Sequence, residues 1–424
     1  MKMIPIDSPH LKVVANTLTT QERHQFRTNI SLSRALSLAA PTDISSKLYR
    51  MLSSFYVTQL AFGKGAGVFA PFVLIDTGSI ETWVQCEGCN PCFELYPRSF
   101  SYKESLTYAR MSIHDPRCVP KTIFEGSCGF SALYIVSRTV GFMGTDTFFF
   151  EDTETGQLRG FKDFAFGCGL ENVNIDFGAN SGSHNIIAGI VGLSPGPRSF
   201  LNQLDAEIKG RFSYCIPSWT ENQQAYSTMY FGEDANISGD EHRRVKAISM
   251  QASKRFHLYL NGISVDGNRL PIDPSIFQLD EKRLTKGFFI DSGAPYTVLA
   301  KSAFNPLIDA IVNYFGKYGW QPMPQPQPFY ICYSSYPKDD QSFPSVVFHF
   351  KLNQRPGDID MVLDKDNMFQ KFENTQGFCL MVHPIDDPGP CLFGAFQQAN
   401  FKFLYDVRKW LLFFVPERCQ ENPE

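Results

Sequence analysis

The segment Phe72–Ser79 reads FVLIDTGS, and a second segment, Phe288–Ala294, reads FFIDSGA. In both segments an apolar run leads into an aspartate, Asp76 or Asp291, that is followed by Thr or Ser and then Gly. A single Asp-Ser/Thr-Gly sequence is ordinary turn chemistry. Two copies with the same apolar lead-in, one in each half of the chain, indicate an internally duplicated protein with two equivalent strand ends.

Two carboxylates at matching strand ends can share one function. Like charges about 3 Å apart cannot both ionise near neutral pH, so such a pair titrates as a unit and holds one proton. The ionised member can take a proton from a water molecule while the protonated member hydrogen-bonds a scissile carbonyl. The sequence therefore predicts general acid-base peptide hydrolysis by Asp76 and Asp291, without a covalent intermediate, a cofactor or a metal.

Length and composition predict a mainly β protein with two lobes. A chain of 424 residues exceeds one ordinary hydrophobic core. Many short runs rich in Phe, Val, Ile, Tyr and Thr are separated by some of the 31 Gly and 27 Pro residues, which is typical of strands and turns. We expect a prosegment remnant at residues 1–50, an N-terminal lobe at 51–240 with a cysteine-rich insert, and a C-terminal lobe at 241–424.

The charge pattern excludes some classes of function. A net charge of −4 without a clustered basic face argues against nucleic-acid binding, and no apolar stretch is long enough to cross a membrane. Residues 1–50 carry more basic than acidic side chains, whereas the remainder is acidic. A basic leader over an acidic cleft would loosen as carboxylates protonate, although a frayed basic tail gives the same pattern.

The cysteines and the start of the sequence point in different directions. Residues 1–7 lack the apolar core of a signal peptide. Eleven cysteines nevertheless indicate an oxidising compartment. We therefore expect passage through the secretory pathway, to an extracellular or vacuolar location, and a truncated start. Two N-glycosylation sequons, Asn29–Ser31 and Asn236–Ser238, depend on that route.

A second duplicated feature follows each aspartate. The runs Ala188–Leu193 (AGIVGL) and Cys391–Phe396 (CLFGAF) each place a glycine, Gly192 or Gly394, at the end of an apolar strand. Such a strand can pass close behind a catalytic loop only where glycine lets two backbones approach.

These motifs, together with several others, resemble those of the pepsin-superfamily aspartic endopeptidases, in their plant nepenthesin-like group. The resemblance runs almost from end to end. The further matching segments are Trp83–Cys86, Phe166–Gly169, Arg211–Cys215, Gly262–Val265, Arg269–Pro271, Phe396–Phe401, Leu404–Asp406 and Cys419. The resemblance implies a bilobal pepsin-like fold, with two duplicated β-barrel-like lobes and an active-site cleft between them.

The resemblance also implies how the two loops are held. Thr77 and Ser292 would exchange hydroxyl-to-backbone hydrogen bonds across the lobe junction, next to Gly78 and Gly293 of the same motifs. We expect these residues to support the catalytic pair.

The fourth residue of each motif differs. Ser79 would donate a hydrogen bond to the outer oxygen of Asp76 and so lower its pKa, whereas Ala294 cannot do this for Asp291. The apparent pKa values of the pair should therefore be higher, and the activity optimum less acidic, than with two hydroxyls.

A flap over the substrate is a further expectation from the resemblance. Tyr134 matches the flap tyrosine, and Trp83 its indole partner; both would contribute to substrate binding. Tyr134 is followed by Ile135–Arg138, without the usual glycines, and such a tip does not easily adopt the positive φ angles of a tight hairpin turn. Alternatively, Tyr134 is an ordinary strand aromatic.

The cysteine pattern departs from the twelve of the family, since the insert has five cysteines instead of seven and Cys391 is extra. An odd count leaves at least one cysteine unpaired or intermolecular, and by resemblance Cys332 and Cys379 form the C-lobe bridge. The spacing of Cys86, Cys89 and Cys92 could suggest a metal site, but no fourth cysteine fits a zinc or iron–sulfur spacing.

Gly192–Gly196 (GLSPG) matches the nucleophile-elbow pattern of serine hydrolases. Pro195 has no N–H to stabilise an oxyanion, so we interpret Ser194 as a turn residue.

Two functions remain. The first is an aspartic endopeptidase, acting as a monomer on extended peptide or protein substrates. The second is a catalytically impaired pepsin-like protein that serves as a binding protein or inhibitor. Retention of both Asp76 and Asp291 favours the enzyme.

Overall fold

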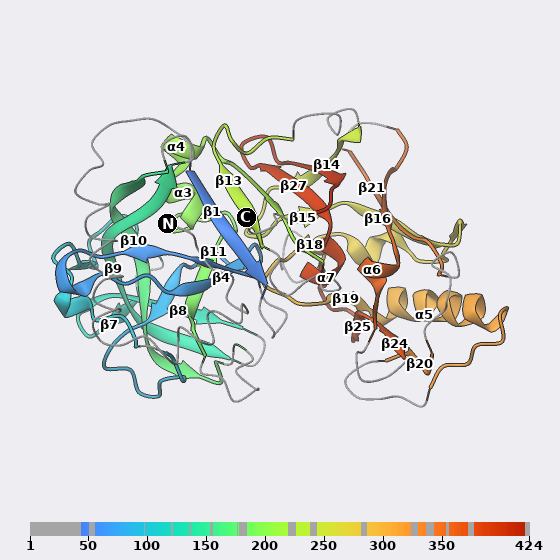
Figure 1. Cartoon of the computed structure of the whole chain (residues 1–424), viewed down its shortest axis with the longest axis horizontal. Helices are drawn as coiled ribbons and strands as arrows, with labels where there is room; N and C mark the ends of the chain where they lie inside the picture. The colour runs from blue at the N-terminus through green and yellow to red at the C-terminus, as the bar shows by residue number, and fades with distance from the viewer. Residues whose placement is uncertain are drawn as a thin grey trace. The chain divides into compact units, whose positions relative to one another are not determined.

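A computed structural model gives the fold of this chain (Figure 1). It describes residues 44–50, 56–96, 98–119, 122–134, 137–152, 156–175, 177, 185–218, 226–237, 244–280, 286–323, 330–335, 343–352, 356–371 and 377–419. Most of the expected prosegment, residues 1–43, and the sequon at Asn29 lie outside these ranges. None of the helices in the described ranges combines the length and hydropathy that a membrane-spanning segment needs.

The chain divides into two compact units. Unit 1 runs up to Tyr214 and takes up the chain again from Gln223 to Asn236, whereas unit 2 comprises Cys215–Asn222 and Ile237–Gln420. Both units are built mainly of strands, coloured blue to green in unit 1 and yellow to red in most of unit 2 (Figure 1). The prediction of a mainly β fold is confirmed.

Two long strands dominate unit 1. β9 (Arg138–Asp152) and β10 (Leu158–Val173) pair antiparallel along their lengths, with a bulge between Phe161 and Phe164. β8 (Ser127–Leu133) forms a hairpin with β9, and β1 (Ile44–Arg50) pairs with β13 (Tyr226–Phe231). Residues 44–50, which we assigned to the prosegment remnant, are thus a strand of the unit 1 sheet.

A smaller group of strands in unit 1 carries the first aspartate. β4 (Phe72–Asp76) lies between β2 (Tyr56–Gln59), which is antiparallel to it, and β11 (Ile187–Gly192), which is parallel. β5 (Trp83–Gln85) pairs with both β11 and β10. β11 is apolar and buried throughout, as expected for a central strand that is covered on both faces.

The other elements of unit 1 are β3 (Ala61–Phe62), β6 (Ala109–Arg110), β7 (Ile123–Phe124), β12 (Arg211–Cys215, whose last residue belongs to unit 2), η1 (Gly65–Gly67), η2 (Tyr102–Glu104), α3 (Phe200–Gln203) and α4 (Asp205–Ile208).

Unit 2 contains β14 (Lys246–Gln251), β15 (His257–Leu258), β16 (Leu260–Val265), β17 (Asn268–Arg269), β18 (Phe288–Ile290), β19 (Thr297–Ala300), β20 (Cys332–Tyr333), β21 (Val346–Phe350), β22 (Ile359–Leu363), β23 (Phe369–Lys371), β24 (Phe378–Leu380), β25 (Val382–Ile385), β26 (Cys391–Phe393), β27 (Phe401–Asp406), β28 (Leu411–Pro416), η4 (Pro274–Phe277), α5 (Lys301–Gly316), α6 (Lys365–Met368) and α7 (Ala395–Gln398).

Three arrangements organise unit 2. β18 lies parallel to β26, and β19 pairs with β25 and β26, so that the second aspartate follows a buried strand. A separate four-stranded sheet has the order β17-β16-β21-β22, and a three-stranded sheet has the order β20-β24-β23. α5 buries its apolar residues at helical spacing, among them Phe304, Leu307 and Ile311.

All eleven cysteines are described, and ten of them form disulfides. The pairs are Cys86–Cys168, Cys89–Cys92, Cys118–Cys128, Cys215–Cys419 and Cys332–Cys379. The structure thus contains the bridge expected between Cys332 and Cys379. Cys391 is buried and unpaired, and burial raises the pKa of its thiol to about 11.

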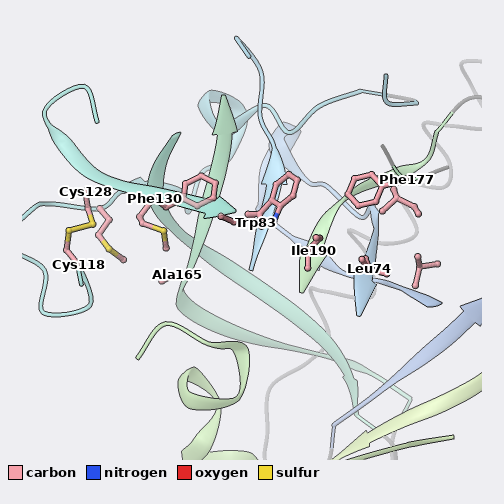
Figure 2. Close-up of a cluster of buried hydrophobic side chains, with 13 residues drawn as sticks. Leu74, Trp83, Cys118, Cys128, Phe130, Ala165, Phe177 and Ile190 are labelled. Carbon is pink, nitrogen blue, oxygen red and sulfur yellow. A yellow bond between two sulfur atoms is a disulfide. The ribbon is translucent and has the colours of Figure 1, made fainter. Parts of the chain in front are cut away.

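Trp83 lies in the middle of a buried apolar cluster of unit 1 (Figure 2). Phe130 and the Cys118–Cys128 disulfide lie on one side of the indole, and Phe177 on the other. Trp83 itself is fully buried. The Cys118–Cys128 disulfide and Phe130 of β8 therefore belong to the same buried cluster as the indole of Trp83.

Candidate active site

The Asp76 loop is supported by β11, the strand that runs parallel to β4. Gly192 lies opposite Asp76 in the parallel pairing of β11 with β4. A Cβ atom on Gly192 would lie only 2.4 Å from the carbonyl carbon of Ile80, so only glycine fits there. Beyond it, Ser194 donates from its hydroxyl to the carbonyl of Thr77 at 2.6 Å and from its N–H to Ser79 at 2.9 Å.

Each oxygen of the Asp76 carboxylate has its own donor. Oδ1 accepts a hydrogen bond from the N–H of Gly78 at 2.8 Å, and Oδ2 accepts one from the hydroxyl of Ser79. Asp76 is only 6% exposed. Because both donors favour the ionised form, this loop stabilises a carboxylate rather than a carboxylic acid.

The hydroxyl of Tyr134 is coupled to the same loop. Trp83 donates from its indole Nε1 to Tyr134 Oη at 2.7 Å. Burial, followed by the negative charge of Asp76, raises the pKa of Tyr134, so this hydroxyl stays protonated. Tyr134 stands at the end of β8, and its N–H donates to the carbonyl of Ser137 at 2.8 Å. The glycine-free residues 135 and 136 lie outside the described residues.

The Asp291 loop repeats the backbone arrangement in unit 2. Asp291 follows β18 and donates from its N–H to Phe393 of β26 at 3.0 Å. A Cβ atom on Gly394 would lie 2.2 Å from the carbonyl carbon of Tyr296. Asp291 Oδ1 accepts from the N–H groups of Gly293 at 2.9 Å and Ala294 at 3.1 Å.

Side-chain amides support the second loop in a way that the sequence analysis missed. Gln398 donates to the carbonyl of Phe393 at 2.7 Å and to that of Asp291 at 3.2 Å. Gln397 accepts from the N–H of Thr297, whose hydroxyl in turn accepts from the N–H of Gly394. Both glutamines are fully buried, and the available signal was two consecutive amides shortly after an apolar strand.

Thr77 and Ser292 are also buried, at 0% and 2% exposure. Their expected hydrogen bonds connect the two units, so this exchange stays a prediction. Unit 1 brings together Asp76, Ser79, Trp83 and Tyr134, and unit 2 places Ser292, Gly293 and Ala294 around Asp291.

A second hydrogen-bonded array has the connectivity of a serine-hydrolase triad. His349 Nε2 is 2.7 Å from Ser264 Oγ, and its Nδ1 is 2.7 Å from Asp360 Oδ1. Ser264 is 6% exposed and lies within β16, which has neighbours on both sides, and the Asp360 side chain is half exposed. These residues lie on adjacent strands of the four-stranded sheet, and we interpret them as a polar cross-strand ladder.

In the described part of the chain, no group of three or more His, Cys, Asp or Glu residues is arranged to hold a metal ion. Cys86, Cys89 and Cys92 all lie in disulfides.

Comparisons with known proteins agree with this architecture. The sequence profile of the xylanase inhibitor N-terminal family matches residues 56–233, and that of the xylanase inhibitor C-terminal family matches residues 255–416. Aspartic proteinase nepenthesin-1 from Nepenthes gracilis is 28% identical over 393 residues, which cover 90% of this chain and 82% of that protein. Aspartyl protease AED1 from Arabidopsis thaliana is 29% identical over 350 residues, which cover 82% of this chain and 68% of that protein.

Solved structures show the same fold at lower identity. The crystal structure of edgp superposes with a TM-score of 0.72 at 16% identity and covers 90% of this chain and 96% of its own. Basic 7S globulin from soybean superposes with a TM-score of 0.68 at 17% identity, covering 89% and 96%. With the duplicated aspartate loops, the matching profiles and the nepenthesin relatives taken together, the chain belongs to the pepsin-like family of plant aspartic proteases, in the nepenthesin-like group.

Proposed function

We propose that this protein is an aspartic endopeptidase in which Asp76 and Asp291 act together on one water molecule. The observation that carries the proposal is the duplicated carboxylate loop. In each unit an aspartate ends a buried strand, accepts backbone N–H donors on Oδ1 and is backed by a parallel strand that ends near a glycine. The chain therefore contains both carboxylate loops that the proposed mechanism needs.

In the proposed mechanism the ionised carboxylate removes a proton from the water as it attacks the scissile carbonyl carbon. The protonated carboxyl group donates to the carbonyl oxygen and stabilises the tetrahedral intermediate. A proton then passes to the leaving amine, and the carbon–nitrogen bond breaks. Asp76 accepts the Gly78 N–H on Oδ1 and the Ser79 hydroxyl on Oδ2, and both bonds favour its ionised form, so Asp76 is assigned the role of the base.

The experiment is a cleavage assay on an unfolded protein substrate from about pH 2 to 7, the range in which a carboxylate pair titrates. We expect cleavage that a statine-type transition-state inhibitor blocks and that Asp76→Asn abolishes. Ser264→Ala should cleave as the wild type does, and a fluorophosphonate should not inhibit. Absence of cleavage by a folded, leader-free protein would contradict the proposal.

A second candidate function is supported by the names of the matching profiles, which are those of xylanase inhibitors. In this alternative the chain binds a partner enzyme and does not cleave it. The matched test measures inhibition of a xylanase by the wild type and by Asp76→Asn. Equal inhibition by both proteins, together with no cleavage of peptides, would favour the binding function.

The five disulfides support passage through the secretory pathway to an extracellular or vacuolar location. We propose that the protein acts there as a monomer on peptide or protein substrates. Gel filtration combined with light scattering would test the monomer.

A further inference from the structure

A buried ion pair lies beside the Asp76 loop and takes no part in the proposed chemistry. Arg198 Nη2 is 2.5 Å from Glu81 Oε1, and the two side chains are only 5% and 17% exposed. Both side chains are less than one-fifth exposed, unlike those of surface pairs such as Arg98–Glu104 and Lys209–Glu233. Burying two charges costs desolvation energy that their attraction need not repay, so stability alone does not explain the pair.

The pair joins two segments that both touch the site. Glu81 lies between Ser79, which donates to Asp76, and Trp83, which donates to Tyr134. Arg198 lies in the loop after β11, and its carbonyl accepts a hydrogen bond from Gln203 at 3.0 Å.

Backbone packing brings these segments together. A Cβ atom on Gly192 would lie 2.7 Å from the N–H of Glu81, and one on Gly196 would lie 2.6 Å from the Ile80 side chain. The ion pair thus connects residues 79–83 to the loop after β11, whose Ser194 hydrogen-bonds the Asp76 loop.

The charge of Glu81 also reaches the site. Burial and the negative charge of Asp76 are the larger causes of the raised pKa of Tyr134, and the negative charge of Glu81 raises this pKa further. The Tyr134 hydroxyl accepts a hydrogen bond from the Trp83 indole. The neighbouring strands β2 and β11 carry no charged side chain. Glu81 and Arg198 are thus charged groups next to the Asp76 loop in unit 1, and Tyr134 is a titratable one. Glu81 Oε2 and Arg198 Nη1 are buried without another partner, so each charge depends on the other for compensation.

We propose that Glu81 and Arg198 form a positioning pair that holds the Ser79–Trp83 segment in register and keeps its net charge at zero beside Asp76. The inference rests on the proposed endopeptidase function and adds a determinant of its working pH. Removing the charge of Arg198 leaves an uncompensated anion that disfavours ionised Asp76. Removing the charge of Glu81 leaves an uncompensated cation that favours it.

The test compares pH–rate profiles of the wild type, Arg198→Met, Glu81→Gln and the double variant. We expect the acid limb of kcat to move up by about half to one pH unit in Arg198→Met, and down by less than that in Glu81→Gln. The double variant should return close to the wild-type profile. The matched control is an exposed pair of unit 1, Lys209 with Glu233, whose substitution by Met and Gln should leave the profile unchanged.

A second readout does not require protease activity. In protein labelled with 15N-tryptophan, the indole N–H of Trp83 reports its hydrogen bond to Tyr134. We expect a changed shift and faster hydrogen exchange in each single variant, with recovery in the double variant. This readout tests the pair even if the protein proves to be a binding protein.

Arg198→Lys keeps the positive charge and replaces Arg198→Met in the comparison if the Met variant does not fold. Its acid limb of kcat should match that of the wild type, whereas hydrogen exchange at the Trp83 indole should be faster. Unchanged acid limbs and an unchanged Trp83 signal in all folded variants would overturn the proposal. So would a shift of the same sign in both single variants.

Discussion

The two aspartate loops share a backbone design but differ in their side chains. Both place the aspartate at the end of a strand, and both have a glycine where the backing strand ends. The first loop adds the Ser79 hydroxyl and the Tyr134–Trp83 hydrogen bond, whereas the second has Ala294 at the position of Ser79 and is supported by the Gln398 amide. Duplication has kept the geometry of the turn, and the chemistry around each carboxylate has diverged.

This difference teaches which features each role requires. A carboxylate that acts as a base needs donors to its ionised form, and Asp76 has donors on both oxygens. A carboxyl group that stays protonated in the resting state gains nothing from a hydroxyl donor on its outer oxygen. The asymmetry of the loops therefore fits a division of labour between two residues of the same type.

The largest effect should come from removing either carboxylate. Asp76→Asn and Asp291→Asn should each lower kcat by about a thousandfold or more, because positioned proton transfer is lost. The double variant should be little worse than either single variant, since the two residues act as a unit. Substantial activity in either single variant would show that the two loops are not equivalent partners.

The backing glycines test whether the shared backbone design is needed in both units. Gly192→Ala and Gly394→Ala should each lower the free energy of unfolding by about 3 kcal/mol or more, because the new Cβ would meet backbone atoms at 2.4 and 2.2 Å. Gly316→Ala, at the end of α5 with nothing within 4 Å, is the control and should be neutral. Chemical denaturation measures all three. A tolerated Gly394→Ala would show that only unit 1 needs the close approach.

A buried histidine in unit 2, next to the strand that leads to the second aspartate, makes the stability of the protein depend on pH. His257 pairs with Phe289 of β18, and burial lowers its pKa to about 4. Its folded-state pKa lies below the unfolded value of about 6.5. The stability associated with neutral His257 is therefore complete above pH 6.5 and is lost as the pH falls to about 4, by about 3 kcal/mol in total.

The variant His257→Phe should lack this part of the loss of stability at acid pH. The free energy of unfolding of the variant should fall less between pH 6.5 and 4 than that of the wild type, as measured by denaturant titration. Equal acid losses in the two proteins would show that His257 protonates without cost in the folded state.

The smallest effect should come from exchanging the fourth residues of the motifs. Ser79→Ala removes a donor to ionised Asp76, so the acid limb of kcat should move up by about one pH unit. Ala294→Ser adds a hydroxyl to the other loop and should move the profile toward lower pH. The pH dependence of cleavage measures both, and an unmoved profile in both variants would show that the hydroxyl does not set the pKa values.

Much of the fold and the geometry of the two aspartate loops could be predicted because the decisive signals are local in sequence. The apolar run before Asp76, and its copy before Asp291, gave the strands and the turns. Gly192 and Gly394 could be identified because only glycine, which has no Cβ atom, lets two backbones approach so closely.

Contacts between distant segments were not predictable in the same way. The pairing of Glu81 with Arg198 depends on how the loop after β11 folds back on residues 79–83, and neither residue lies in a recognisable motif. Gln397 and Gln398 lie in the matching segment Phe396–Phe401, but that match did not reveal which backbone groups the two buried amides hydrogen-bond.

The route of the chain through the two units has a consequence for biosynthesis. Unit 2 takes Cys215–Asn222, the chain then returns to unit 1, and Cys215 is finally joined to Cys419 near the end of the described chain. Neither unit is encoded by one uninterrupted stretch, and the disulfide of unit 2 cannot close until the chain as far as Cys419 has left the ribosome. Folding must therefore await a late, long-range event, and a nascent chain stalled before Cys419 would expose an open strand edge to chaperones and proteases.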